Sequence, residues 1–525
     1  MTRPALTLRD WAVIASVNGI WLSGYASWLW WWPEPVMIAI VAAAVGFAPG
    51  AAWDWIWPRR SRALGALVSR VLVTSAVALV LALMAFRLFH VAPTQVGMWA
   101  AMAALSNLGL VAGWRLGRRL AGPRTTTRRE LAVAMVALAA VLWATTVMAT
   151  RVVPALPDHD LEMQGTGYAL LTRLEPRLRT DRGLQYYFAH PPLLHVYIAT
   201  SFLYQGELRA LQAYDSLTTV AAVDDTFARA PHLLETRTPN IGFAAVTAAL
   251  LVLWTFRRSR RWWLSGLVVA AYLSSPEVVV RSAYGGYFAL STLATLLMVM
   301  SVGRGGRTGV ATGLAVWAVW VNHKVIVVIA GIALGHFAAA RRTHSGVRPA
   351  AALAGGAAVG TALFWVYGYV IAPQDFVTDH LGHHLWQRVI HANPLGYGGY
   401  PTLVGLWREF IVHTGLVLLP AGLVLAATDL GRTRDRGAAG TAQSWVLAGV
   451  LIVTAVVFSV IDWRMTKHLM PMVLALHMVL TPTRHAAPWR VAAAAATCLW
   501  LIVWNIPVVV SLVRDFAGFT VTPAW

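Results

Sequence analysis

The chain has 525 residues, of which 58% are hydrophobic and only 12% are charged. This composition is more apolar than a soluble core needs, so it excludes an ordinary soluble domain and predicts a polytopic membrane protein. The 42 Lys and Arg residues outnumber the 22 Asp and Glu residues and give a net charge of +20. The basic residues stand in short clusters between apolar runs, which is typical of a chain oriented across a membrane and argues against nucleic acid as a partner.

Apolar runs close to the roughly 20 residues that cross a bilayer recur along the whole chain. The candidate spans are 11–30, 35–52, 64–88, 93–113, 131–150, 240–256, 262–280, 284–302, 308–321, 325–340, 350–372, 410–428, 443–461, 469–482 and 491–511. Several are short. We therefore expect an all-α polytopic membrane protein with a bundle of about 13–15 transmembrane helices.

Basic clusters follow these runs at intervals of two spans. They are 59–62, 115–129, 257–261, 304–307, 341–342, 432–436 and 484–490. Lys and Arg collect in cytoplasmic loops, so we expect all these clusters on the cytoplasmic face. Counting spans from them, which we call the parity argument, places residues 151–239, 373–409 and 462–468 on the opposite, external face. The Ala, Arg and Trp bias suggests a bacterial host and hence its inner membrane.

We divide the chain into three parts. Residues 1–130 are N-terminal transmembrane helices, and residues 131–340 are a transmembrane module that includes the long external loop 151–239 and, by the motifs described below, the candidate catalytic residues. Residues 341–525 are C-terminal transmembrane helices with an external His-rich loop at 373–409.

The external loop contains an acidic motif, Pro157-Asp158-His159-Asp160-Leu161-Glu162, and later the turn His190-Pro191-Pro192. Three carboxylates so close together are costly beside a bilayer, so they predict a polar site at the membrane surface. The alternative is a solvated connector in which the carboxylates cap a helix N-terminus. The apolar stretch 192–204 is short for a span, and parity favours a re-entrant or surface position.

Several elements, taken in order, resemble the GT-C superfamily of glycosyltransferases, nearest to the protein mannosyltransferase and aminoarabinose transferase branch. The matching elements are Asp158-His159-Asp160, Tyr168, His190-Pro191-Pro192-Leu193, Arg237 with Pro239, Ser275-Pro276 ahead of Arg281, Asn322-His323-Lys324, Phe458-Ser459-Val460, Lys467-His468 and Pro471. The resemblance covers residues 131–480. It implies transfer of a sugar from a polyprenyl-phosphate donor to a hydroxyl acceptor on the outer face, with inversion at the anomeric carbon and without a cofactor.

Such a transfer needs a base that takes the acceptor proton, and an external carboxylate supplies one. The family's acidic pair is Asp-Glu, whereas this chain has Asp-His-Asp, so two aspartates compete for the role. Spacing to the His-Pro-Pro turn favours Asp160 as the catalytic base, with Asp158 second and Glu162 in support. A divalent magnesium or manganese ion at Asp158 and Asp160 is a weaker alternative.

The leaving phosphate needs cations and hydrogen-bond donors. The family's Lys before the proline turn is His190 here, which is weakly charged near neutral pH, so phosphate binding should depend more on Lys324 and Lys467. The expected substrate-binding residues are His159, Glu162, Tyr187, His190, Arg237, Lys324, His380, His383, His384, Lys467 and His468.

His380, His383 and His384 would share one face of a helix. Histidines spaced by three and four residues are also a zinc-binding arrangement, and a plain solvated face is a third interpretation beside contact with acceptor or phosphate. A second class of function, a transporter or lipid-linked sugar flippase without transferase activity, would show internal repeats and charges at the bilayer midplane. Neither is apparent in the sequence.

Overall fold

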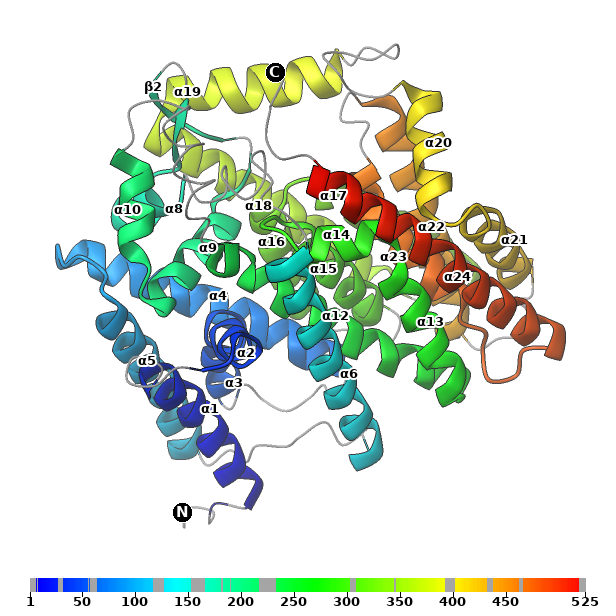
Figure 1. The fold of residues 1–525 in the computed structure, drawn as a ribbon, viewed down its shortest axis with the longest axis horizontal. Coiled ribbons are helices and arrows are strands. Elements are labelled where there is room, and N and C mark those ends of the chain that lie inside the picture. The colour runs from blue at the N-terminus through cyan, green and yellow to red at the C-terminus, as the bar shows by residue number, and fades with distance from the viewer. Residues whose placement is uncertain are drawn as a thin grey trace.

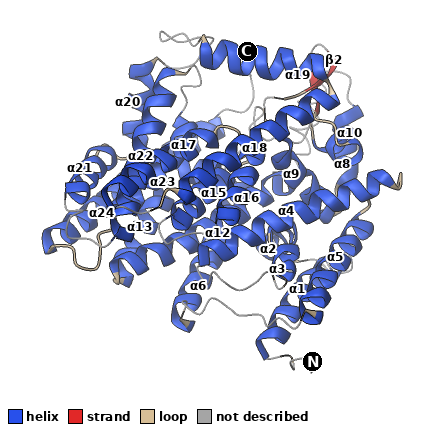
Figure 2. Ribbon diagram, turned by 180° about the vertical axis from the view of Figure 1, so that it is seen from behind, coloured by secondary structure: helices blue, strands red, loops and turns tan. Residues whose placement is uncertain are grey.

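The computed structural model describes residues 6, 8–26, 32–54, 56, 64–116, 127–152, 166–180, 183–188, 190–216, 233–302, 308–343, 346–391, 402–431, 438–461 and 466–518. Within these ranges the chain is helical apart from one antiparallel hairpin, β1 (Arg177–Thr180) paired with β2 (Gly183–Tyr186) (Figure 2). The expected helical membrane architecture is confirmed. The hairpin was not predicted.

The helices of the N-terminal half pack around a buried apolar core. They are α1 (Leu8–Ala26), α2 (Glu34–Gly46), α3 (Ala48–Trp53), α4 (Leu64–Leu88), α5 (Gln95–Arg115), α6 (Arg128–Val147), η1 (Met148–Val152), α8 (Gly167–Arg173), α9 (Pro192–Gln205), α10 (Leu208–Ser216) and α12 (Leu233–Ser259). Capping residues determine where some of these helices begin. At α6, for example, the Thr127 hydroxyl accepts the Glu130 N–H while the Glu130 carboxylate accepts the Thr127 N–H.

The C-terminal half continues the same bundle. Its helices are α13 (Trp262–Ser274), α14 (Pro276–Ser282), α15 (Phe288–Val302), α16 (Thr308–Val321), α17 (Val325–Thr343), α18 (Arg348–Ile371), α19 (Pro373–Phe376), η3 (Val377–Ile390), α20 (Leu403–His413), α21 (Leu418–Gly431), α22 (Ala438–Val460), η5 (Thr466–Leu469), α23 (Met470–Leu480) and α24 (Pro488–Gly518). Together the two halves make a multi-pass membrane protein.

Among the described residues, eight helices are long and apolar enough to cross a membrane, or up to ten if each of two bent helix pairs counts as one span. The expected 13–15 exceeds this number because several apolar runs form short helices, such as α2 with 13 residues and α16 with 14. Helix α9 also has only 14 residues and is buried from Pro192 to Tyr204. At 1.5 Å per residue it is shorter than the bilayer core and lies inside the protein.

Ion pairs join the described basic clusters at one end of the bundle. Arg257 at the end of α12 pairs with Glu130 at the start of α6, with 3.3 Å between Nε and Oε1. Arg258 pairs with Asp429 of α21 at 3.2 Å, and Arg490 at the start of α24 lies 3.8 Å from the same carboxylate. These contacts place cluster 257–261 beside Arg490 of cluster 484–490 and beside Asp429, which lies shortly before cluster 432–436. The parity argument expects these three clusters on the same face. We call this end the basic end.

The opposite end, which we call the histidine end, is covered by a helix that turns aside from the bundle. After α18 ends, α19 and η3 run along the upper edge of the molecule (Figure 1). We call Pro373–Ile390 the cover helix. It exposes Val377, Trp386 and Ile390, whereas His380 is buried.

Helices α17 and α22 touch through their backbones. A Cβ atom at Gly335 would lie 2.2 Å from the carbonyl oxygen of Trp445, and a Cβ at Gly449 would lie 2.1 Å from that of Gly331. Glycines permit this approach because they have no side chain. Since α17 begins directly after Lys324 and α22 leads toward η5, the glycine contact brings Lys324 close to η5.

The replacement Gly449→Ala should therefore destabilise the protein by about 1–3 kcal/mol, because the added methyl group forces the two helices apart. Thermal unfolding in detergent measures the effect. The matched control is Gly355→Ala in α18, where an added Cβ meets nothing within 4 Å. Equal midpoints for the two variants would contradict the close packing.

Candidate functional site

The turn between α16 and α17 presents Lys324 at the histidine end. The Asn322 side chain fixes this turn, because its amide nitrogen donates to the Ser291 hydroxyl at 3.0 Å and its oxygen accepts the Lys324 N–H at 3.1 Å. The Lys324 ammonium donates to the Tyr287 hydroxyl at 3.2 Å and lies 3.5 Å from Nε2 of His468. Three segments distant in sequence thus meet at one lysine.

These side chains line a pocket. Its polar lining includes Tyr287, Lys324, Lys467 and His468 beside Ser291 and Asn322, and we call it the cationic pocket. Lys467 and His468 belong to η5 and are buried, with 8% and 5% of their surfaces exposed. The remaining walls are mainly apolar and include Phe288, Val325, Val328, Phe458, Met470 and Pro471. Two lysines and a histidine beside apolar walls suit an anion attached to a hydrophobic group.

A group of aromatic rings extends from the cationic pocket to the His-Pro-Pro turn. The His190 ring lies 4.9 Å from the Tyr287 ring and 6.3 Å from the His323 ring, measured between centroids. Tyr187 meets His190 edge-on at 6.1 Å, and His195 lies 6.5 Å from His190. Burial and the positive charge of Lys324 hold the pKa of His190 well below that of a free histidine. His190 is therefore a neutral hydrogen-bonding group at pH 7.

The cover helix is attached to the segment before this turn. The Phe188 N–H donates to Oδ2 of Asp379 at 2.7 Å, and Nδ1 of His380 lies 3.2 Å from the Phe188 carbonyl oxygen. His384 in turn pairs with Oδ1 of Asp379 at 3.3 Å. Burial opposes ionisation of Asp379, but the hydrogen bonds from His384 and the Phe188 N–H lower its pKa overall. Burial lowers the pKa of His380 to about 4.

The three histidines of the cover helix have different surroundings. His380 packs between Phe364 and Phe376, with ring centroids 4.9 and 5.1 Å away, whereas His383 lies 2.9 Å from the Gln387 side-chain oxygen on its own helix. The shared zinc-binding face that their spacing suggests is not formed in the described part of the chain. Aromatic rings enclose His380, whereas the rings of His383 and His384 lie next to each other, with centroids 5.0 Å apart.

Arg237 is fully buried near the start of α12 and does not line the cationic pocket. Its guanidinium donates to the Ala149 carbonyl oxygen at 2.5 Å, in the segment that leads into the acidic loop. The structure thus separates Arg237 from Lys324, Lys467 and His468. The Arg237 contact instead holds η1 against the start of α12.

Asp158, His159, Asp160 and Glu162 lie outside the described residues, in the segment 153–165. The residue that follows this segment is described. The Thr166 hydroxyl lies 2.6 Å from Nδ1 of His195, whose ring is the neighbour of His190. The acidic loop therefore ends beside the histidines.

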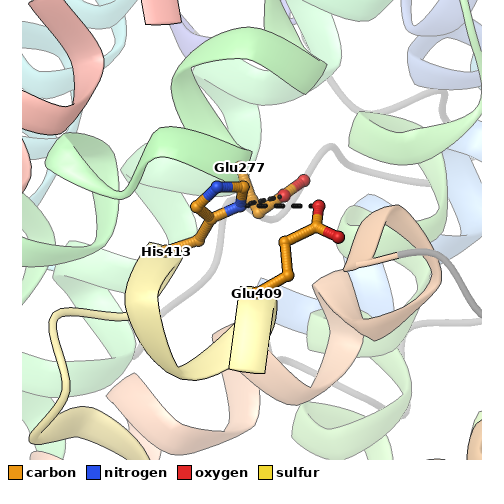
Figure 3. A group of neighbouring side chains, drawn as sticks. All are labelled: Glu277, Glu409 and His413. Carbon is orange, nitrogen blue, oxygen red and sulfur yellow. Dashed lines mark hydrogen bonds and ion pairs between the residues drawn. The ribbon is translucent and has the colours of Figure 1, made fainter. Parts of the chain in front are cut away.

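A second polar group at the same end was not predicted. Oε1 of buried Glu277 lies 2.9 Å from Nδ1 of His413 and accepts the Thr466 hydroxyl at 2.6 Å, and Oε2 pairs with Arg281 at 3.0 Å. Glu409 lies one helical turn before His413, and both point toward Glu277 (Figure 3). Of these residues the sequence analysis named only Arg281. Glu277, Tyr287 and His195 carry no local pattern that would have indicated the site.

An apolar pocket lies next to the cationic one. Helices α6, α12, α13, α14 and α15 form its walls with residues such as Val141, Ala244, Leu273, Val278 and Ala289. Met470, the first residue of α23, lines both pockets.

Comparisons with protein-family models, curated protein sequences and solved structures found no match.

The attachment of the cover helix can be tested with Asp379→Asn. The neutral amide should weaken the bond to the Phe188 N–H by about 1–2 kcal/mol, which is a factor of roughly 5–30 in the hydrogen-exchange rate around Phe188. Because folding lowers the pKa of Asp379, the wild-type protection is full above the unfolded pKa and is lost as the pH falls through the folded value.

The matched control is Asp375→Asn, an exposed position of the same helix. Mass-spectrometric hydrogen exchange at pH 7 gives the readout. Unchanged exchange in Asp379→Asn, or an equal change in both variants, would show that this carboxylate does not attach the helix.

Proposed function

We propose that this chain is a membrane glycosyltransferase of the GT-C type. It transfers a sugar from a polyprenyl-phosphate donor to a hydroxyl acceptor, at the outer face of a bacterial inner membrane and with inversion. The observation that supports this most strongly is the cationic pocket of Tyr287, Lys324, Lys467 and His468, which adjoins an apolar pocket at Met470.

The cationic pocket suits the phosphate of the donor. Lys324 and Lys467 supply two ammonium donors from segments that are far apart in the sequence. Lys324 follows α16, and Lys467 belongs to η5. Their positive charge would offset the charge that develops on the phosphate as it leaves. His468 and the Tyr287 hydroxyl add further hydrogen-bonding groups that fix the orientation of the oxygens.

The apolar pocket suits the isoprenoid chain. Its residues come from apolar helices, of which α6 and α12 are long enough to cross a membrane, so a hydrocarbon tail would leave the phosphate position directly into an apolar environment. Burying such a tail contributes about 0.8 kcal/mol for each methylene group removed from water. A soluble sugar nucleotide would gain nothing from these walls, which favours a lipid-linked donor.

In the proposed reaction the acceptor hydroxyl attacks the anomeric carbon, and the bond from that carbon to the phosphate oxygen breaks. The proton passes to Asp160, with Asp158 as the second candidate, and the lipid phosphate leaves with its charge held by the two lysines. Asp160 precedes Thr166 by six residues, a distance of at most about 21 Å of extended chain. This length is compatible with a carboxylate that works beside His190.

The charges of the two ends support an outward-facing site. The basic end carries Arg257, Arg258 and Arg490 and therefore belongs in the cytoplasm. The histidine end then faces outward. An acceptor would approach beneath or beside the cover helix, whose inner face presents His384 and Asp379.

The direct test is transfer of a radiolabelled sugar from a defined polyprenyl-phosphate donor in reconstituted membranes. Asp160→Asn should lower the rate by about 10²–10⁴-fold if it is the base. Lys324→Met and Lys467→Met should each lower it by roughly 10²–10³-fold, because phosphate stabilisation is lost.

Arg408→Met, an exposed cation of the same end outside both pockets, is the matched control and should keep wild-type activity. A chelator arm tests the metal alternative at Asp158 and Asp160. Normal turnover in Asp158→Asn and in Asp160→Asn would remove the catalytic assignment. Donor binding and movement across the bilayer without any transfer would favour the lipid-linked sugar flippase.

A further inference from the structure

We infer that Glu277, Glu409 and His413 form a binding site for a divalent transition-metal ion, best suited to Zn²⁺. One ligand atom from each residue, Oε1 of both glutamates and Nδ1 of His413, lies within 4.8 Å of the other two. Figure 3 shows the three side chains converging from two helices. This inference concerns residues outside the cationic pocket and does not rest on the proposed transferase activity.

Rigid elements position the three ligands. Glu409 and His413 are four residues apart on α20, so they project from the same side of one helix. Glu277 comes from the first turn of α14, which bends by 70° from α13, and its side chain is buried. Nδ1 of His413 lies 2.9 Å from the Glu277 oxygen and 3.9 Å from the Glu409 oxygen. A small expansion would admit an ion at their centre.

The groups around the ligands orient them as neighbours of metal ligands usually do. Arg281 holds the Oε2 oxygen of Glu277 at 3.0 Å, which leaves Oε1 directed toward His413. The Thr466 hydroxyl lies 2.6 Å from this Oε1 and 3.1 Å from Oε1 of Glu409. Because Arg281 contacts Oε2 and not Oε1, it does not occupy the position that an ion would take. It also keeps the Glu277 carboxylate in one orientation.

The ligand set distinguishes among ions. One imidazole nitrogen and two carboxylate oxygens suit Zn²⁺, which accepts nitrogen and oxygen ligands in a four-coordinate arrangement, whereas Mg²⁺ and Ca²⁺ prefer oxygen ligands alone. Three protein ligands leave a fourth position for water or another group. The Glu409 side chain is 42% exposed, so an ion can reach the site from outside.

An ion here would join three segments. It would be bound by α14 and α20 and would lie next to Thr466, the residue directly before Lys467 and His468. Metal binding should therefore stabilise the histidine end of the fold.

The test is Zn²⁺ binding to the purified full-length protein after treatment with a chelator, measured by metal analysis after desalting and by calorimetric titration. Wild type should retain one ion per chain, and saturating Zn²⁺ should raise its thermal midpoint. Glu409→Gln and His413→Ala should each bind at least about tenfold more weakly and lose the thermal shift. Co²⁺ should give the visible absorption of a tetrahedral site in wild type alone.

The matched control is His485→Ala, an exposed histidine at the basic end, which should bind as wild type does. Glu409→Gln replaces a partly exposed side chain by its isostere, so it decides the matter if His413→Ala fails to fold. Absence of a stoichiometric ion in wild type, or equal retention in wild type and Glu409→Gln, would overturn the inference. Loss of the ion in His485→Ala would place the ion at another site and would also overturn the inference.

Discussion

The turn Asn322–Lys324 separates the apolar helices α16 and α17, and the position of the Lys324 ammonium depends on this break. A lysine inside a continuous membrane helix would be costly. At the break, the Asn322 side chain satisfies the exposed backbone and the Lys324 side chain reaches Tyr287 and His468. The polar site can therefore exist only where helices are interrupted.

Other interruptions occur at the same end of the bundle. Helices α13 and α14 bend by 70° and α20 and α21 by 86°, and η5 precedes α23 with a tighter winding. Each break leaves backbone groups without helical hydrogen bonds and lets polar side chains point away from the helix axis. Such non-helical backbone is tolerated in a membrane where the protein itself encloses it. Glu277, His413 and Lys467 all lie at such breaks. The basic end, by contrast, is held by ion pairs between regular helix ends.

Apolar runs predicted the long helices well, because hydrophobicity is a local property of the sequence. The run 64–88 coincides with α4, and 93–113 differs from α5 by two residues at each end. Short buried helices such as α9 were harder to interpret, since burial on all sides comes from tertiary packing. The hairpin β1–β2 gave no signal, because its eight paired residues are mostly polar and alternate weakly.

The order and sidedness of the motifs led us to expect Lys324, His190, Lys467 and His468 near one another, and their geometry is compatible with that expectation. Their partners could not be foreseen. Tyr287 and Glu277 are single residues in apolar surroundings, and only the folded chain brings them to Lys324 and His413. Spacing on a helix suggested a common role for His380, His383 and His384, but aromatic rings enclose His380, whereas His383 and His384 lie next to each other.

The central claim is that the cationic pocket holds a lipid phosphate whose chain enters the adjoining apolar pocket. A cryo-electron microscopy structure of the protein reconstituted with polyprenyl phosphate tests it most directly. The account predicts phosphate density within hydrogen-bonding distance of the Lys324 and Lys467 ammonium groups, with the chain passing Met470. Phosphate density at the basic end, or a chain that leaves both pockets empty, would contradict it.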